Sequence, residues 1–307
     1  MQFGLGPPEY SNLGPRCLKL GFSLSPLNTY LNARIRVKTQ TSYCFQRVPY
    51  DLDMKLLYKL FQLDSRKIWI LFIHRVIWVT ENTFFYPKLF RAYKKLRLTP
   101  TYGNNLIVFD VGAHHGQSIR FFKRLYTNAE VFSFEPQKNS YKILGLRVAK
   151  WRYKGISTYP FGLGDVTKTM DFHESVLSET STFILPNKDS KYLKQKNRFL
   201  FQKKANSFKS VLTNITTLDN FVRENKVNMI DILKIDVEGF ELNVIRGANV
   251  TLTQNKINIL QIENQRNDMR QNDYLAIDTF LKERHYCKVA EIRHPFGSFY
   301  ELLYKRG

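Results

Sequence analysis

Five short apolar runs alternate with helix-like segments in the last two thirds of this 307-residue chain, and their order constrains the fold more than any other feature. The runs are rich in Ile, Val, Leu and Phe, which favours strands. Strands that alternate with helices are typical of a parallel sheet covered on both faces. We therefore expect an α/β fold with a mostly parallel, twisted sheet. The expected strands are Leu106–Phe109, Val131–Phe134, Ile156–Phe161, Ile230–Ile235 and Ile257–Ile262, and the expected helices lie around Gln117–Leu125, Lys138–Val148 and Phe240–Ile245.

A long stretch between Asp165 and Asn228 interrupts this alternation. Residues 188–209 within it hold eight Lys or Arg and a single acid, and we interpret them as a mobile flap. Because a structureless connection of this length is unusual in a compact domain, part of the stretch should form strands. The expected strands are Thr169–His173 and Ser181–Leu185.

The first 53 residues are expected to be a disordered or targeting extension, because Gly and Pro interrupt them and no periodicity is sustained. Residues 1–49 contain six Lys or Arg with Glu9 as the only acid, together with many Ser and Thr. That composition is typical of an organellar transit peptide. A disordered extension and a translation start near Met54 are the alternatives.

Residues 54–104 are predicted to form a basic helical extension that precedes the main domain, residues 105–307. Pro100 and Gly103 mark a linker between the two. The most apolar segment, Ile68–Val79, has 12 residues and includes a histidine and an arginine, whereas a membrane span takes roughly 20. We expect a packed or interfacial helix and no transmembrane span. The apolar face of the extension begins with Leu56, Leu57, Leu60 and Phe61.

The formal net charge of +21 is relatively denser in the N-terminal third. Residues 1–104 hold 16 Lys or Arg against 5 acids, and residues 105–307 hold 31 against 21. This balance favours an anionic surface as a partner of the N-terminal region and of residues 188–209, although a solvated basic surface would look the same. The three cysteines match neither a metal site nor a disulfide framework, so a reducing, cytoplasmic location is expected unless residues 1–49 direct import.

The segment FDVGAHHGQS follows the first expected strand and opens a helix. Gly112 and Gly116 permit a tight turn and a close approach of backbone to a nucleotide-like ligand, with Ala113 and His115 lining the same turn. The segment is not the dinucleotide pattern G-x-G-x-x-G and has no phosphate-binding lysine. The acidic Asp110 before the glycines suits a cationic ligand such as S-adenosylmethionine.

Two further motifs end strands that should lie beside the glycine turn. In FSFEP, Glu135 can accept hydrogen bonds from the two hydroxyls of a ribose, and Pro136 follows it. In FGLGD, Gly164 and Asp165 could meet an adenine amino group. A turn aspartate that binds local backbone N–H groups is an equally good interpretation of Asp165.

The segment LKIDVEGFELNVIRGA, Leu233–Ala248, carries the strongest signal. It places Asp236 at the carboxyl end of a buried strand, where open α/β sheets bind their ligands. Gly239 ends the strand, and a helical face that starts at Phe240 ends near Gly247.

These motifs together resemble the FkbM family of S-adenosylmethionine-dependent methyltransferases. The matching segments, in order, are FDVGAHHG, FEP, GLGD, TLDNF (Thr217–Phe221) and Leu233–Ala248, and they span most of residues 106–265. The resemblance implies a class I Rossmann-like methyltransferase fold that binds S-adenosylmethionine and transfers a methyl group to oxygen, often on a sugar or a secondary-metabolite hydroxyl. His115 departs from the family, which usually has Asn there, so a local cofactor contact should differ.

Methyl transfer to an alcohol requires the acceptor oxygen to be aligned and its proton to be accepted. Asp236, Glu263 and Asn264 present oxygen atoms at neighbouring strand ends, a layout that resembles the magnesium site of catechol O-methyltransferases. Magnesium is our own inference and not a property of the family.

The alternative to a metal is that acidic side chains position the substrate and a basic side chain accepts the proton. In that interpretation Glu238 and Glu263 bind acceptor hydroxyls, and Lys234, His114 or His173 takes the proton.

The leading functional hypothesis is an O-methyltransferase acting on a hydroxyl of a carbohydrate or a related small molecule. RNA methylation is a second hypothesis, favoured by the charge and by the 14% aromatic content. The sequence contains no recognisable nucleic-acid-binding motif. The third hypothesis is an inactive methyltransferase fold that serves as an interaction or membrane-associated module through residues 54–98.

Overall fold

The computed structural model describes residues 65–101, 103–175, 180–199, 208–266, 268 and 273–307. The predictions for residues 1–53, and for the apolar face that begins at Leu56, lie outside the described residues.

A seven-stranded sheet forms the centre of the described part, with the strand order β3-β2-β1-β7-β8-β10-β9. Neighbouring strands from β3 to β8 are parallel, whereas β10 runs antiparallel to both β8 and β9. The predicted parallel α/β sheet is therefore confirmed. The strands are β1 (Ile107–Val111), β2 (Glu130–Phe134), β3 (Ile156–Tyr159), β7 (Ile230–Ile235), β8 (Ile257–Gln265), β9 (Tyr286–Arg293) and β10 (Phe299–Arg306).

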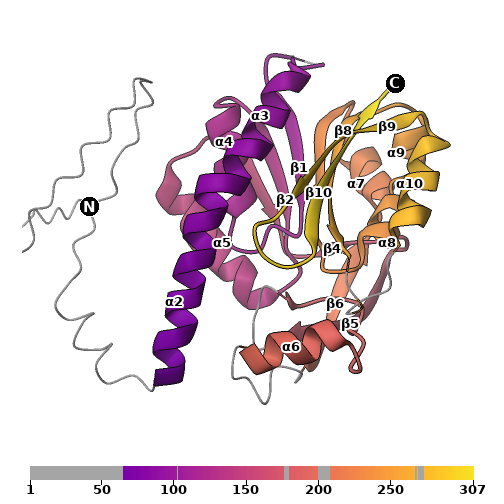
Figure 1. The fold of residues 1–307 in the computed structure, drawn as a ribbon. Coiled ribbons are helices and arrows are strands. Elements are labelled where there is room, and N and C mark those ends of the chain that lie inside the picture. Colours follow the sequence, from indigo (N-terminus) through magenta and orange to yellow (C-terminus); the bar gives the residue numbers. More distant parts are fainter. Residues whose placement is uncertain (1–64, 102, 176–179, 200–207, 267, 269–272) are drawn as a thin grey trace, which may run out of the picture. The chain divides into compact units, whose positions relative to one another are not determined.

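Helices cover both faces of this sheet (Figure 1). One layer contains α3, α4 and α5, and the other contains α7, α8 and α10. The three predicted helices are present, and α4 has the predicted bounds. Their bounds are α3 (Tyr86–Leu96), α4 (Gln117–Leu125), α5 (Lys138–Trp151), α7 (Leu218–Glu224), α8 (Glu241–Arg246), α9 (Asn249–Thr253) and α10 (Tyr274–Lys282).

Alternation along the strands sends apolar side chains into both layers. Phe109, Leu233 and Leu260 face the layer of α7, α8 and α10, which we call the packing face. Val108 and Ile232 face the layer of α3, α4 and α5, which we call the site face. Both sets are fully buried, so the sheet is the shared wall of two hydrophobic cores.

In the described part of the predicted N-terminal extension, residues 65–96 form one continuous helical run. It consists of α2 (Ser65–Thr80), a π-helical turn η1 (Glu81–Phe85) and α3. Phe85, Leu89 and Tyr93 are buried in the core of the site face, so the end of the extension is packed onto the sheet. None of the helices in the described ranges is long and apolar enough to cross a membrane.

The long basic stretch forms a smaller sheet in the order β4-β6-β5. Its strands are β4 (Gly162–Leu163), β5 (Lys168–Ser175) and β6 (Phe208–Thr216), so the strand predicted at Thr169–His173 is confirmed. The strand predicted at Ser181–Leu185 is wrong. Thr182 makes only an isolated bridge to His173, and its hydroxyl donates to the carbonyl of Glu238 and accepts from the N–H of Ile184, which turns the chain locally.

The flap predicted at residues 188–209 is a helix over part of its length, α6 (Lys191–Phe199). Asp268 explains why, because its carboxylate accepts hydrogen bonds from the hydroxyl of Ser190 and from the backbone N–H groups of Lys191 and Tyr192. These bonds at the helix N-terminus lower the pKa of Asp268 to about 2. The acid that binds the N-terminus of α6 lies far away in sequence, so local composition gave no sign of it.

Candidate functional site

The glycine turn after β1 lies against the loop after β7. Gly112 has φ +84°, and a Cβ atom there would lie 1.8 Å from the backbone oxygen of Asp236. The N–H groups of Gly112 and Ala113 both donate to the carbonyl of Phe134 at 3.0 Å. Only glycine, which has no Cβ atom, allows the two backbones to come this close. The carboxyl ends of β1, β2 and β7 therefore form one surface. Gly116, with φ +83°, is the N-cap of α4.

Two residues other than glycine adopt the left-handed backbone region in the loops of this surface. His114 has φ +44° after β1, and Glu238 has φ +57° after β7. Such strain at non-glycine residues tends to cluster at functional sites. The other described non-glycine residues with positive φ follow the ends of helices, where that conformation is ordinary: Arg97, Arg152, Lys226, Asn255 and His285.

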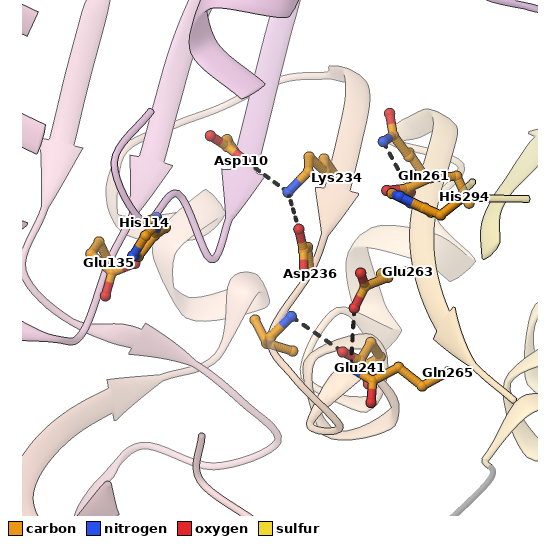
Figure 2. Close-up of polar contacts among 12 residues, drawn as sticks. Asp110, His114, Glu135, Lys234, Asp236, Glu241, Gln261, Glu263, Gln265 and His294 are labelled. Atoms are coloured by element: carbon orange, nitrogen blue, oxygen red, sulfur yellow. Dashed lines mark hydrogen bonds and ion pairs between the residues drawn. The ribbon is translucent and has the colours of Figure 1, made fainter. Parts of the chain in front are cut away.

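Glu135 is buried at the end of β2, beside the turn, as Figure 2 shows. One carboxylate oxygen accepts the N–H of His114 at 2.7 Å, and the other accepts the N–H of Gln137 at 2.8 Å. Each oxygen keeps a lone pair for a ligand hydroxyl, as the ribose prediction requires. Burial raises the pKa of Glu135 to about 7, against the effect of the two N–H donors.

Lys234 joins two carboxylates across β1 and β7 (Figure 2). Its Nζ lies 3.5 Å from Oδ1 of the fully buried Asp110 and 3.0 Å from Oδ2 of Asp236. Burial alone would lower the pKa of Lys234, but Asp236 and Asp110 outweigh it and raise the pKa above its usual value. Lys234 is thus held as a cation, which argues against the prediction that it accepts a proton. The sequence alone could not show this, because the pairing depends on strand register.

Glu263 lies near the end of β8 among other acidic side chains. Although part of its surface stays exposed, burial and the carboxylates of Asp236, Glu238 and Glu301 raise the pKa of Glu263 well above its usual value. The Nε2 of Gln265 donates to Glu238 at 2.9 Å and to Glu263 at 3.2 Å. This edge of the sheet is therefore acidic, in contrast to the chain as a whole.

Polar side chains continue across the site face as one row, which we call the polar band. Ser133 pairs with Asp110, Asp110 with Lys234, and Lys234 with Gln261 in the registers of four adjacent strands. Glu263 and Glu301 face each other from β8 and β10. The members of the polar band are Ser133, Asp110, Lys234, Gln261, Glu263 and Glu301.

The outer end of the polar band contains residues that the sequence reasoning missed. Gln261 donates to Glu301 at 3.0 Å and accepts from the hydroxyl of Tyr93. His294 lies 3.6 Å from Glu301 and 3.7 Å from Glu81 of the N-terminal helix. Burial would lower the pKa of His294, but the two carboxylates raise it to about 9. No local pattern signals this network, because Tyr93 and Gln261 are 168 positions apart.

Asp165 and Gly164 occupy a different place from the one predicted for adenine contacts. They follow β4 of the smaller sheet, not a strand of the main sheet. The Nδ2 of Asn243 donates to Asp165 at 3.1 Å, and a Cβ on Gly164 would lie 2.8 Å from the ring of Phe240. Neither contact is with a local backbone N–H group, so the adenine contact and the turn alternative both stay predictions.

The magnesium ligands predicted from Asp236, Glu263 and Asn264 do not converge. Glu263 and Asn264 are neighbours on β8 and therefore point to opposite faces of the sheet. Within the described ranges, no group of three or more His, Cys, Asp or Glu side chains is placed to hold a metal ion. Magnesium therefore stays a prediction.

Two of the predicted histidines lie in the glycine turn, and the third lies in the smaller sheet. His114 and His115 stack with ring centroids 3.7 Å apart in the glycine turn. Burial, and then the neighbouring His115, lower the pKa of His114 to about 4, so its imidazole is neutral at neutral pH. His173 lies within β5 of the smaller sheet.

The strand order, with an antiparallel β10 next to β8, and the glycine turn at the end of β1 define a class I Rossmann-like methyltransferase fold. The model of the methyltransferase FkbM domain matches residues 110–287. The chain therefore belongs to the FkbM methyltransferase family.

Two curated relatives are similar over about half of the chain. "Methyltransferase 1" from Beauveria bassiana is 23% identical over 145 residues, which cover 46% of this chain and 58% of that protein. "Methyltransferase sdnD" from Sordaria araneosa is 25% identical over 159 residues, which cover 48% of this chain and 61% of that protein. The match spans about three fifths of each relative's length.

Among solved structures, magnesium protoporphyrin IX methyltransferase from Synechocystis PCC 6803 with bound SAM is 10% identical, with a TM-score of 0.40 and coverage of 72% of this chain and 78% of that chain. A likeness this distant says nothing of activity.

Proposed function

We propose that this chain is an S-adenosylmethionine-dependent O-methyltransferase that acts on a hydroxyl of a carbohydrate or a related small molecule. The observation that carries the proposal is the convergence of the glycine turn, Glu135 and the Asp110–Lys234–Asp236 ion pairs at the carboxyl edge of three adjacent strands. That edge is where α/β sheets of this type bind ligands.

The residues present fit the cofactor. Gly112 leaves room for backbone to approach a ligand, and Glu135 offers a lone pair on each oxygen to the ribose hydroxyls. When bound, S-adenosylmethionine supplies a methyl group on a positively charged sulfur. An acidic edge tolerates that charge, so the local field favours the cofactor over its neutral product.

Asp236 is our candidate for the residue that orients the acceptor. Its side chain is partly exposed at the end of β7, whereas Asp110 and Lys234 beneath it are buried. Lys234 fixes one carboxylate oxygen at 3.0 Å and leaves the other to accept the acceptor hydroxyl. The bound cofactor would supply the methyl group to the acceptor oxygen, and Asp236 would accept the hydroxyl proton and pass it to water.

Glu263 and Glu238 would bind further acceptor hydroxyls. Burial and the neighbouring carboxylates raise the pKa of Glu263, which favours its protonated form, and a protonated carboxyl can donate a hydrogen bond to the acceptor as well as accept one. Carboxyl groups that can do both suit a polyhydroxyl compound.

The same acidity argues against RNA as the acceptor. Glu263 is surrounded by the carboxylates of Asp236, Glu238, Glu301 and Glu241, and a phosphate backbone entering this edge would meet like charge. Uncharged polyhydroxyl compounds carry no such cost.

The test is transfer of a labelled methyl group from S-adenosylmethionine to metabolites extracted from a strain that lacks the gene. We expect label in the small-molecule fraction as a base-stable ether, and its loss with Asp236→Ala. The matched control is Asp171→Asn, an exposed aspartate of β5 that bonds Ser210. It should leave transfer unchanged. Label in an RNase-sensitive fraction, or full activity of Asp236→Ala, would contradict the proposal.

A further inference from the structure

Four large apolar side chains of α2 are exposed, next to the exposed Arg75. Phe72 is 56% exposed, Trp78 47%, Val79 45% and Trp69 39%, and among the α2 side chains that the structure describes only Ile73 is buried. A helix on a protein surface normally turns charged and polar side chains to water. This helix instead exposes four large apolar side chains, which we call the aromatic ridge.

Contacts within the aromatic ridge hold its rings in place. Trp69 stacks on Phe72 with ring centroids 5.8 Å apart, and the guanidinium of Arg75 lies 4.6 Å from the ring centre of Trp78. Rings that are already paired present a formed surface to a partner. Trp and Arg side chains together favour the boundary between water and lipid headgroups, where the ring is buried and the charge stays hydrated.

The same helical run is strongly basic. Residues 65–100 contain eight Lys or Arg and a single acid, Glu81. The carboxylate of Glu81 lies 3.7 Å from Nδ1 of His294, so its charge is already compensated. Exposed positions recur at steps of three or four residues from Phe72 to Lys95, so the aromatic ridge continues into exposed cations, Lys88, Arg91, Lys94 and Lys95.

The opposite side of the run is fixed to the domain. Phe85 and Leu89 are buried in the core of the site face, and the hydroxyl of Tyr93 donates to Gln261 of β8. The aromatic ridge is therefore not the surface through which the helix packs on the sheet. Large apolar side chains that are exposed together mark an interaction site.

The positive charge of this helical run favours one kind of partner over another. A second copy of the chain would bring two equally basic helices together, which like-charge repulsion opposes. A surface of anionic lipids supplies both an apolar interior for the ridge and negative headgroups for the cations.

We propose that the helical run α2–η1–α3 lies along an anionic lipid surface, with the aromatic ridge inserted at the headgroup boundary and the cations of α3 on the headgroups. In this arrangement the run lies on the bilayer and does not cross it.

Sedimentation of the full chain with vesicles tests this. We expect binding to vesicles of phosphatidylcholine with about 30% phosphatidylserine, which have a negative surface potential. Vesicles of phosphatidylcholine alone should bind little of the protein. Added salt should weaken binding because it screens the headgroups.

The triple variant Trp69→Ser, Phe72→Ser, Trp78→Ser should reduce binding at least about tenfold, as expected when several apolar side chains lose their burial. Lys88→Gln and Arg91→Gln should each cost about fivefold.

The control is Leu146→Ser with Leu275→Ser, which removes two side chains that are 67% and 74% exposed on α5 and α10. It should bind vesicles as the wild type does, and circular dichroism should show all variants folded. Equal binding to both vesicle types, or unchanged binding of the triple variant, would overturn the proposal. So would a wild type that does not bind vesicles, together with a triple variant that loses self-association or oligonucleotide binding.

Discussion

The two faces of the main sheet share a strand backbone but differ at the carboxyl ends of the strands. On the packing face, apolar side chains continue to the last positions of β1, β2 and β7, which are Val111, Phe134 and Ile235. On the site face, Val108 and Ile232 are apolar, but Asp110 and Lys234, two positions further, are charged.

The apolar side chains of the packing face build the fold, whereas the charged side chains of the site face serve the site. The packing face could form the sheet by burial alone, whereas the site face holds charges that are stable only as a set. Substitutions on the packing face should therefore change stability alone. Substitutions in the polar band should change stability, ligand binding and pH dependence together.

The largest expected effect is on the polar band. Lys234→Met leaves Asp110 buried without its cation, and breaking a buried ion pair costs about 3–5 kcal/mol in the free energy of unfolding. Urea denaturation measures the loss. The double variant Asp110→Asn, Lys234→Met removes both charges and should recover much of the lost free energy of unfolding. A double variant as unstable as the single one would contradict the claim that these charges are stable only as a set.

Ile235→Ala should cost nearly as much on the packing face. Ile235 is fully buried, and removing such a side chain costs about 2–5 kcal/mol through lost burial and the cavity it leaves. Affinity for S-adenosylhomocysteine, measured by calorimetry at a temperature where the variant is folded, should stay within about twofold of the wild type, the scatter expected for a site that keeps its contacts. A tenfold loss of affinity would show that the faces are coupled.

The polar band should also make stability depend on pH. The pKa of His294 is about 9 in the folded chain and about 6.5 when unfolded, so folding favours its protonated form. Its stabilisation is complete below pH 6.5 and is lost as pH rises through about 9, at most about 3 kcal/mol. Wild type and His294→Asn should differ in urea midpoint at pH 6 and converge near pH 10. A constant difference would contradict the ion pairs with Glu81 and Glu301.

The smallest expected effect is on cofactor affinity. Because the pKa of Glu135 is raised to about 7, lowering the pH protonates it and removes an acceptor for the ribose. Affinity for S-adenosylhomocysteine should fall by up to about tenfold per pH unit below 7. A Glu135→Gln variant should show no such slope between pH 6 and 8.

The sequence predicted the elements whose pattern is local. Apolar runs with β-rich composition located β1, β2 and β7, and helical spacing gave α4 with its observed bounds. Glycine at positions 112 and 116 predicted a tight turn, and both adopt positive φ. Each of these features is decided within about ten residues, which is why a single sequence reveals it.

Features that depend on distant partners were not predictable. The helix α6 needs Asp268, the charge state of Lys234 needs the register of β1 with β7, and the network of His294 needs Glu81 from the N-terminal helix. The turn at Ser181–Leu185 was misjudged because Thr182 favours strands by composition but bonds the loop after β7 instead.

Calorimetric titration with S-adenosylhomocysteine at pH 8 tests most directly the claim that the site face binds the cofactor. We predict saturable binding by the wild type and a loss of affinity of roughly tenfold or more with Glu135→Gln, because hydrogen bonds to a charged group are removed. The matched control is Glu130→Gln at the opposite end of β2, which bonds Asn105 and should bind normally. Absence of binding by the wild type, or equal affinity of Glu135→Gln, would show that the site face does not bind the cofactor through Glu135.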